Sequence, residues 1–486
     1  MLSELLRHYA VVERTRLAEL VGLAEDALDA ALELLLEQCE IVVDTLLEGS
    51  SELEVCDAEN LERLLRLHRT AQRPQLEPLP LDALPLFLAA LHNLTARGES
   101  LEDLQVGLER LFGYGAPAAA WEREFLPARM DPYHLAWLDS SLQNSDLIWF
   151  GCGHEQVAFC FSDWLDLYHS AAKALEEAAD EADSNTSPFP TSGRFEFEAL
   201  RQQAGLDSDA LHEALWSQVW AGELSSESLA SLRSGLLNKF KPEPMSAAPQ
   251  RRRTGGWRSL KASTGAWFAL HDLEDSGNAR TWDELDEEEA RRDRVRQLFS
   301  RYGVLFKERL SAEQPALQWR SVQRTLRLME FSGEAISGHF FKGVFGLQFT
   351  DHAGLRALRH ELPEEAIYWL NALDPISPCG LGLSAWKGRF PPRVGSTHLV
   401  FRGRELVMVS KRLGRAVELF VAADDPRLPE VLQVFKDLLS RQFDPLKSVL
   451  VETINDEPAH TSPFAPALRA FGFVKDFRQL ALYRRF

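Results

Sequence analysis

The chain has 486 residues and a mass of 54.9 kDa, which at ordinary domain sizes predicts three or four domains. Hydrophobic residues make up 45% and charged residues 26%, a composition that excludes a disordered or collagen-like chain. No apolar run reaches the roughly 18–20 residues that cross a bilayer, and the N-terminus lacks the apolar region of a secretory signal. The five cysteines form no CxxC pair. We therefore expect a cytoplasmic protein with reduced thiols, no metal site and no cofactor.

The charge is unevenly distributed along the chain. Residues 1–190 contain 12 Lys and Arg and 35 Asp and Glu, a net charge of −23. Subtracting these from the chain totals of 53 and 73 leaves 41 basic and 38 acidic residues, a net charge of +3 for the remainder. Because an acidic surface repels a polyanion, any nucleic acid should be held by the second half.

One outline recurs four times in the first three quarters of the chain. Residues 17–21 and 25–39 are predicted helices separated by a turn at Gly22, and a strand-like run follows at 40–43. Helix, turn, helix and strand is the outline of a winged helix. The same outline returns at 195–224 and at 294–349, and a looser copy occupies 104–161. We therefore predict winged-helix domains at 1–75, 80–170, 191–240 and 291–372.

The pattern changes twice after the third copy. Residues 241–290 are first basic and then acidic, without apolar periodicity, and predict a linker. From 373 to 486 short alternating strands and amphipathic helices follow one another: strands at 398–402, 406–411, 417–421, 449–454 and 480–484, and helices at 428–443 and 464–471. This predicts a small β-barrel or α+β unit, and an α+β multidomain fold for the whole chain.

The second helix of each winged unit decides whether that unit can read DNA. In a DNA-binding winged helix this helix enters the major groove and carries Arg, Lys, Asn or Gln. Helix 25–39 carries five acidic residues and no basic one, and the predicted helices 135–143 and 208–220 also lack Lys and Arg. We interpret these three units as protein-packing modules.

The fourth unit differs. Its predicted helix 319–332 carries Arg320, Arg324 and Arg327 at positions i, i+4 and i+7, with Gln323 beside them. Apolar residues occupy the opposite face, so this is the candidate recognition helix. The alternative is a solvated basic face without a partner.

Two further stretches combine bases with aromatic rings. The loop after the helix contains Lys342 next to Phe340 and Phe341, which suits a groove edge or base stacking. The linker contains four residues suited to tracking phosphates with one stacking contact, namely Arg251, Arg252, Arg253 and Trp257. The alternative for this second stretch is an unbound basic linker.

Enzymatic motifs are mostly absent from the sequence. It has no GxxxxGK[ST] and no GxSxG, so the chain is not an ATPase or helicase on its own. In the last unit, Glu452 and Asp476 stand near basic residues. A carboxylate in such a setting can activate water or stabilise an oxocarbenium-like sugar, which makes these two the catalytic candidates.

The chain resembles the C-terminal region of the Lhr-type large helicase-related proteins, in order over nearly its whole length. The stretches that carry the resemblance include EREFLPARMDPYHLAWLDSSLQNSDLIW at 122–149, RRRTGGWRSL at 251–260, GHFFKGVFGLQF at 338–349 and DPISPCG at 374–380. The family implies tandem winged helices and a β-barrel similar to AlkZ-type DNA glycosylases, behind a helicase core that this sequence lacks. It also implies oligomerisation, uracil-DNA glycosylase activity and a catalytic aspartate near the C-terminus, a role that falls here to Asp476.

From these observations we expect a DNA-binding module of an Lhr-like helicase that acts in DNA repair without an ATPase of its own. Its expected partners are single-stranded or forked DNA, a helicase core in the same or a separate chain, and further copies of itself, with no membrane contact. A uracil-type DNA glycosylase is one alternative. An oligomerisation or protein-interaction scaffold is the other.

Overall fold

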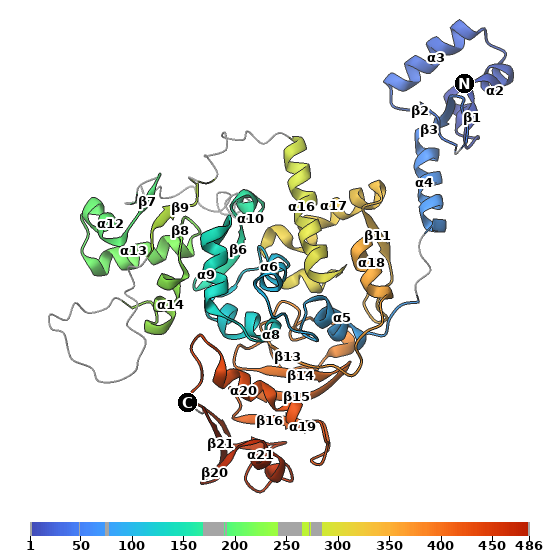
Figure 1. The fold of residues 1–486 in the computed structure, drawn as a ribbon. Coiled ribbons are helices and arrows are strands. Elements are labelled where there is room, and N and C mark those ends of the chain that lie inside the picture. The colour runs from blue at the N-terminus through green and yellow to red at the C-terminus, as the bar shows by residue number, and fades with distance from the viewer. Residues whose placement is uncertain are drawn as a thin grey trace. The chain divides into compact units, whose positions relative to one another are not determined.

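The computed structural model describes residues 2–47, 49–72, 77–168, 189, 192–241, 265–271, 273 and 284–484 (Figure 1). The chain divides into two compact units, residues 1–77 and residues 78–486. No helix among the described residues is both long enough and apolar enough to cross a membrane.

The described residues contain five three-stranded antiparallel sheets, of which four lie within residues 12–351 and one lies within residues 448–483 of the C-terminal unit. The four sheets before the C-terminal unit share one topology. In each, the third strand in sequence lies between the first and the second, in the orders β1-β3-β2, β4-β6-β5, β7-β9-β8 and β10-β12-β11. Helical segments connect the first strand to the second in every case. This is the arrangement of a winged helix, so the prediction of tandem winged-helix domains is confirmed.

The first winged-helix unit has a small apolar core around Leu17, Leu28, Leu32 and Val55. The turn between its second and third helices passes through Gly22, whose φ of +64° is the left-handed conformation that glycine adopts readily. Its elements are α1 (Leu2–Leu6), β1 (Val12–Glu13), α2 (Arg14–Val21), α3 (Glu25–Glu37), β2 (Ile41–Asp44), β3 (Glu54–Asp57) and α4 (Ala58–Gln72).

In the second winged-helix unit, the helical segment 118–129 between the first strand and α9 has a π-helical turn, η1, in its middle. Its elements are α5 (Ala83–Leu91), α6 (Leu101–Glu109), β4 (Ala116–Pro117), α7 (Ala118–Ala120), η1 (Trp121–Phe125), α8 (Leu126–Arg129), α9 (Leu135–Asn144), β5 (Leu147–Gly151), β6 (Gln156–Phe161), η2 (Ser162–Trp164) and α10 (Leu165–Tyr168).

The third unit packs directly on the second. A Cβ added to Gly151 would lie 1.7 Å from the carbonyl oxygen of Val219, so only glycine permits this approach of β5 to α13. The elements are β7 (Arg194–Phe195), α12 (Phe197–Ala204), α13 (Ser208–Trp220), β8 (Leu224–Ser226), α14 (Leu229–Asn238) and β9 (Trp267–Ala269).

The predicted linker 241–290 is wrong at two places. Residues 267–269 form β9, the central strand of the third sheet, and the run Trp267–Leu270 is buried because it is entirely apolar. Residues 284–290 belong to α16, whose first turn carries three acidic residues that interact favourably with the positive end of the helix dipole. The acidic residues from Glu284 onward therefore belong to the start of a helix and not to a linker.

The fourth unit contains the candidate recognition helix, α17, with the bounds that the sequence predicted. The helix ends at Gly333, which has a φ of +83°. The elements are α16 (Glu284–Tyr302), β10 (Val304–Leu305), η3 (Arg309–Ala312), η4 (Pro315–Leu317), α17 (Trp319–Ser332), β11 (Ala335–Gly338), β12 (Gln348–Asp351) and α18 (His352–Arg359).

The C-terminal unit is α+β, and within the described residues it does not form the closed barrel that was one of the two predictions. Its strands make an open sheet of order β13-β14-β15-β16-β18-β19 and a separate sheet of order β17-β21-β20. The predicted strand 449–454 is divided between these sheets after Val451, and the predicted helix 428–443 divides at Leu432.

The C-terminal unit has a mixed order of helices and strands. The elements are β13 (Ile367–Asn371), η5 (Ser384–Trp386), β14 (His398–Arg402), β15 (Glu405–Lys411), β16 (Ala416–Leu419), α19 (Leu428–Val431), α20 (Gln433–Ser440), β17 (Ser448–Val451), β18 (Thr453–Ile454), β19 (Glu457–Pro458), α21 (Ala465–Phe471), β20 (Val474–Asp476) and β21 (Gln479–Tyr483).

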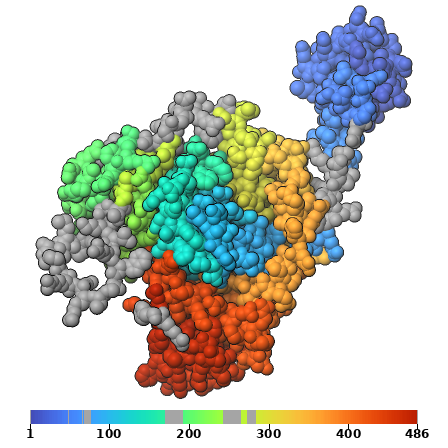
Figure 2. All heavy atoms as spheres, viewed as in Figure 1, coloured from blue at the N-terminus to red at the C-terminus, as the bar shows by residue number. Residues whose placement is uncertain are grey.

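The second unit is in contact with all three of its neighbours in residues 78–486. Gln297 of α16 donates to the carbonyl of Glu109 at 2.8 Å, and His398 of β14 is 2.7 Å from Glu124 of η1. Ser225 of the third unit bonds the carbonyl of Trp149. In Figure 2 the cyan atoms of the second unit accordingly adjoin green, yellow and red ones.

Candidate nucleic-acid interface

The three arginines of α17 form one exposed row. Val322, Leu326 and Met329 turn the opposite face of the helix into the core, and each is 2% exposed or less. This apolar spacing fixes the rotation of the helix, so the exposed residues include Arg320, Gln323, Arg324 and Arg327. The structure thus brings these four predicted residues together on one surface.

The arginines of this row differ in their ion-pair and ring contacts. Within the described part of the chain, Arg320 and Arg324 have no ion-pair partner. Arg327 lies 3.9 Å from Glu330 and sits over the ring of Phe349, 5.9 Å from its centroid. Two guanidinium groups are therefore available for phosphate or base edges, and the third is partly neutralised.

The wing between β11 and β12 differs from the prediction in its aromatic residues. Phe340 and Phe341 are 6% and 1% exposed, so neither ring can stack on a base. The Phe341 ring anchors the wing to α5, because it packs edge-on against Phe87 with centroids 5.6 Å apart. Lys342 is exposed, as predicted, and the exposed aromatic of the wing is Phe345, at 75%.

Sequence reasoning missed Phe345, although a signal for it was present. The residue stands between Gly343 and Gly346, which have φ values of +83° and +86° and shape the tip of the wing. Gln348 fixes the start of the wing loop. Its side-chain oxygen accepts hydrogen bonds from the backbone N–H groups of Phe340 and Phe341 at 3.0 and 2.9 Å. Its role here is structural.

A buried ion pair fixes the fourth unit against the second. Arg301 of α16 and Glu313 are both fully buried and 2.5 Å apart, and Tyr302 donates to Glu313 at 2.6 Å. Arg301 also bonds the carbonyl of Phe112 in the second unit. Burial would lower the pKa of Arg301, but the charge of Glu313 outweighs it and the pKa is raised, so Arg301 stays charged. The row on α17 is thus presented by a fixed support.

The corresponding helices of the second and third units are engaged in packing. The N-terminus of α9 is bonded to the C-terminal unit: the backbone N–H of Leu135 donates to the side-chain oxygen of Gln442 at 3.0 Å. In α13, Trp216 stacks on Trp220 and meets Trp267 edge-on, with centroids 5.2 and 5.6 Å apart. These contacts are what the sequence interpretation of packing modules expects.

The two catalytic candidates lie in and beside the β17-β21-β20 sheet. Asp476 ends β20 and accepts a hydrogen bond from Gln479 at 3.3 Å. Glu452 directly follows β17 and is paired with Arg415 at 3.1 Å and with Arg412 at 3.8 Å. The strand register puts both at one end of the sheet, with β21 between them. They are not in contact.

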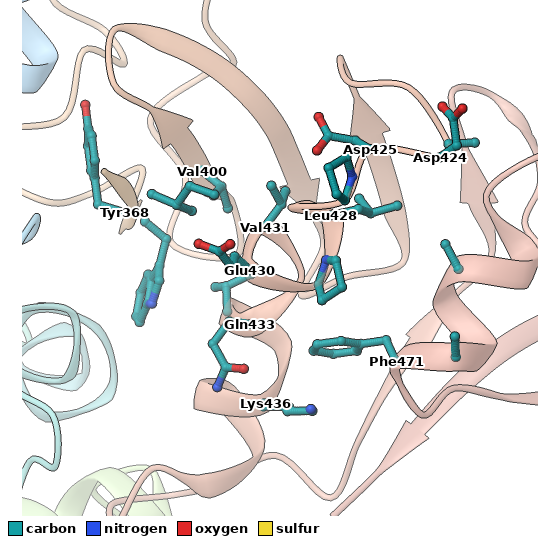
Figure 3. Close-up of a pocket in the computed structure, with 18 of the residues that line it drawn as sticks. Tyr368, Val400, Asp424, Asp425, Leu428, Glu430, Val431, Gln433, Lys436 and Phe471 are labelled. Atoms are coloured by element: carbon teal, nitrogen blue, oxygen red, sulfur yellow. The ribbon is translucent and has the colours of Figure 1, made fainter. Parts of the chain in front are cut away.

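The C-terminal unit also contains a hollow of about 730 Å³ beside β13, α19, α20 and α21 (Figure 3). Its charged lining is largely paired already: Asp425 with Arg402 at 3.1 Å, and Glu430 with Arg427 at 2.8 Å. Lys436 lies over the Phe471 ring, 4.0 Å from its centroid. The hollow therefore offers little unpaired charge to an anionic ligand.

The basic stretch of the predicted linker, with Arg251, Arg252, Arg253 and Trp257, lies outside the described residues. Across the ranges that are described, no group of three or more His, Cys, Asp or Glu side chains is placed to hold a metal ion.

The fold and the exposed arginine row define a tandem winged-helix protein. Two models of the winged-helix domain of large helicase-related proteins match residues 80–167 and 284–370. The chain therefore contains two domains of this type, and the resemblance to Lhr-type proteins that its motifs indicate is confirmed.

Two curated relatives extend the match over most of the chain. One is an Lhr helicase/uracil glycosylase from Escherichia coli (strain K12), 26% identical over 416 residues that make up 79% of this chain and 26% of the relative. The other is an Lhr helicase/probable uracil glycosylase from Mycolicibacterium smegmatis, 27% identical over 434 residues, 82% of this chain and 28% of the relative. The chain thus spans about a quarter of the length of these relatives.

Among solved structures, the chain is similar to the DNA glycosylase AlkZ of Streptomyces sahachiroi. The TM-score is 0.45 and the sequence identity 12%, over 74% of this chain and 95% of that one.

Proposed function

We propose that this chain is a DNA-binding module that works with an Lhr-like helicase in DNA repair, and that its fourth winged-helix domain holds the DNA. The observation that supports this most is the row Arg320, Arg324 and Arg327 on the exposed face of α17. In this topology α17 is the helix that enters the major groove, and the wing beside it adds the exposed Lys342 and Phe345.

The helicase association rests on the two relatives, both named as helicases. In this proposal the ATPase resides in a helicase core, in the same or a separate chain. The acidic first 190 residues would contact protein partners or further copies of this chain, since their recognition-type helices lack bases or are already packed.

Triple alanine substitution of the row tests the proposal. We expect Arg320→Ala, Arg324→Ala and Arg327→Ala together to weaken binding of a forked DNA by roughly 30-fold or more at about 0.1 M salt, because three phosphate or base contacts are lost. Fluorescence anisotropy measures the affinity. The matched control removes three acids from the equivalent helix α3, as Glu25→Ala, Asp29→Ala and Glu33→Ala, and should not weaken binding. Equal affinities of the native and triple-arginine proteins would contradict the proposal.

A second candidate function is removal of uracil from DNA, which is favoured by the two relatives, one named as a uracil glycosylase and the other as a probable one. Asp476 or Glu452 would then activate water or stabilise the sugar cation. A single-stranded oligonucleotide with one deoxyuracil, treated with protein and then alkali, should be cut by the native chain and not by Asp476→Asn or Glu452→Gln. Cutting by both variants would remove these assignments, and no cutting by the native chain would remove this function.

A further inference from the structure

The hairpin of β20 and β21 presents a single aromatic ring at its tip. The register pairs Asp476 with Gln479, so the connection is the two-residue turn of Phe477 and Arg478. The Phe477 side chain is 91% exposed, the highest value among the exposed large hydrophobic residues of the described chain. Burial in this chain's own core therefore does not explain the ring.

The backbone conformation at the tip also indicates that a phenylalanine at this position has a purpose other than folding. Phe477 has a φ of +51°, in the left-handed region where glycine or asparagine is the usual residue of a tight hairpin turn. A phenylalanine there carries a conformational cost and gains no burial in return. Such a local conflict without a folding benefit is typical of a functional position.

The arm that carries the ring is held in place. β21 is the central strand of its sheet, and Leu480 and Leu482 belong to the core of the C-terminal unit. The imidazole of His460 lies 2.9 Å from the carbonyl oxygen of Arg478, which ties the turn to the segment before α21. The ring is thus projected from a rigid support, which lowers the entropic cost of contact with a ligand.

The segment that forms the hairpin is basic, although Asp476 directly precedes the ring. Lys475 and Arg478 flank it and are exposed, and within the described residues neither side chain has an ion-pair partner. Residues 467–484 contain four basic residues and one acidic residue. An exposed aromatic ring between unpaired cations matches the contact that proteins make with single-stranded nucleic acid, where a base stacks on the ring and phosphates meet the cations. A protein partner would not require this excess of positive charge.

We propose that the β20–β21 hairpin is a second nucleic-acid contact of this chain, at which Phe477 stacks on an unpaired base while Lys475 and Arg478 pair with the adjoining phosphates. This inference rests on the proposed DNA-binding function and adds to it a base-stacking site outside the winged helices. It also gives a reason for the position of Asp476, one residue from the ring, if uracil is removed at this end of the sheet.

The test compares two single strands of equal length and charge, a 15-nucleotide oligothymidine and an abasic strand of the same backbone. Phe477→Ala should weaken binding of oligothymidine about tenfold and binding of the abasic strand less than about twofold, because only the first offers a base to stack. Phe477→Trp should retain the native affinity for oligothymidine. Phe420→Ala, which removes a 58% exposed ring elsewhere in the same unit, is the matched control and should have no effect.

The outcomes separate this inference from the proposed function. If the triple-arginine variant of α17 loses affinity while Phe477→Ala binds both strands as the native chain does, the hairpin contact is wrong and the DNA-binding function stands. If the native chain binds no DNA, both are wrong. If Phe477→Ala lowers the mass by light scattering and leaves DNA affinity unchanged, the hairpin contacts a second copy of the chain and the inference is overturned.

Discussion

The first and the fourth winged-helix domains share one strand order and differ in the charge of one helix. In the first, α3 carries five acidic residues and no base, and Asp29 is engaged by Arg14 at 2.6 Å. In the fourth, α17 carries three arginines and one glutamate, and two of the arginines have no ion-pair partner in the described chain. Both helices bury the same kind of apolar stripe.

The winged-helix topology therefore sets which helix is exposed, and the residues on that helix set what it can bind. A polyanion is repelled by α3 and attracted by α17 at the same place in the fold. Three of the four predictions below test this difference between the two domains or the support on which it depends, and one tests the contact of the second domain with the C-terminal unit.

Reversing the charge of α17 should have the largest effect. Arg320→Glu, Arg324→Glu and Arg327→Glu would make this helix resemble α3, and we expect DNA affinity to fall at least about 100-fold at about 0.1 M salt, because attraction becomes repulsion. Fluorescence anisotropy with a forked DNA measures the change. An affinity within about threefold of the native value would show that α17 is not the binding helix.

Breaking the buried pair that supports the fourth domain should have the next largest effect. Arg301→Met leaves Glu313 buried without its partner, which we expect to cost about 3–5 kcal/mol of the free energy of unfolding. Urea denaturation followed by tryptophan fluorescence measures this free energy. All tryptophans lie at or after Trp121, so the signal reports on residues 78–486 and not on the separate unit 1–77. The control is Arg296→Met on the same helix, whose ion pairs are partly exposed and should contribute under about 1 kcal/mol. Equal effects of the two would contradict the supporting role.

Acidification should loosen the contact of the second domain with the C-terminal unit. Burial would raise the pKa of Glu124, but His398 and Arg441 outweigh it and hold the pKa below its usual value. A carboxyl with a lowered pKa in the folded state stabilises the fold above its unfolded-state pKa, and this stabilisation is lost as the pH falls through the folded-state pKa. The melting temperature of the native chain should therefore fall more steeply below about pH 4.5 than that of Glu124→Gln. If the curves of melting temperature against pH ran parallel for the native chain and for Glu124→Gln, the contact of Glu124 with His398 and Arg441 would not account for the loss of stability in acid.

The smallest effect concerns the arginines within α17. Arg324 has no ion-pair partner in the described chain, whereas the Arg327 guanidinium forms an ion pair with the Glu330 carboxylate at 3.9 Å. We expect Arg324→Ala to weaken DNA binding about fivefold and Arg327→Ala about twofold, because a neutralised guanidinium loses less on removal. Anisotropy titrations of the two single variants give the ratio. A larger loss for Arg327→Ala would place the centre of the contact toward Phe349.

Much of the fold could be predicted because periodicity and turn residues acted together. The bounds of α13 and α17 agree with the sequence, since apolar spacing and the following glycine or turn mark both ends. The linker prediction failed at Trp267–Ala269, where three residues are too few to show a period and pair only with strands far away in sequence. The barrel prediction failed because local patterns do not show which strands pair with which.

The candidate site could be predicted only in part for a related reason. The row on α17 follows from helical spacing alone. Which aromatic residues of the wing are exposed could not be predicted, because all of them look alike in the sequence. Only the contact with Phe87 shows that Phe341 is buried. The glycines around Phe345 mark a turn at the tip of the wing, whereas the exposure of Phe477 depends on what the rest of the chain leaves uncovered, which no local pattern contains.

The most direct test of the central claim is the salt dependence of DNA binding by the native chain and by the variant with Arg320, Arg324 and Arg327 replaced by alanine. Each phosphate contact contributes about 0.9 to the slope of log affinity against log salt concentration for duplex DNA. If the row on α17 contacts phosphates, the slope should decrease by about 2 to 3 in the variant. An unchanged slope would contradict the account, because it would mean that DNA is held elsewhere on the chain.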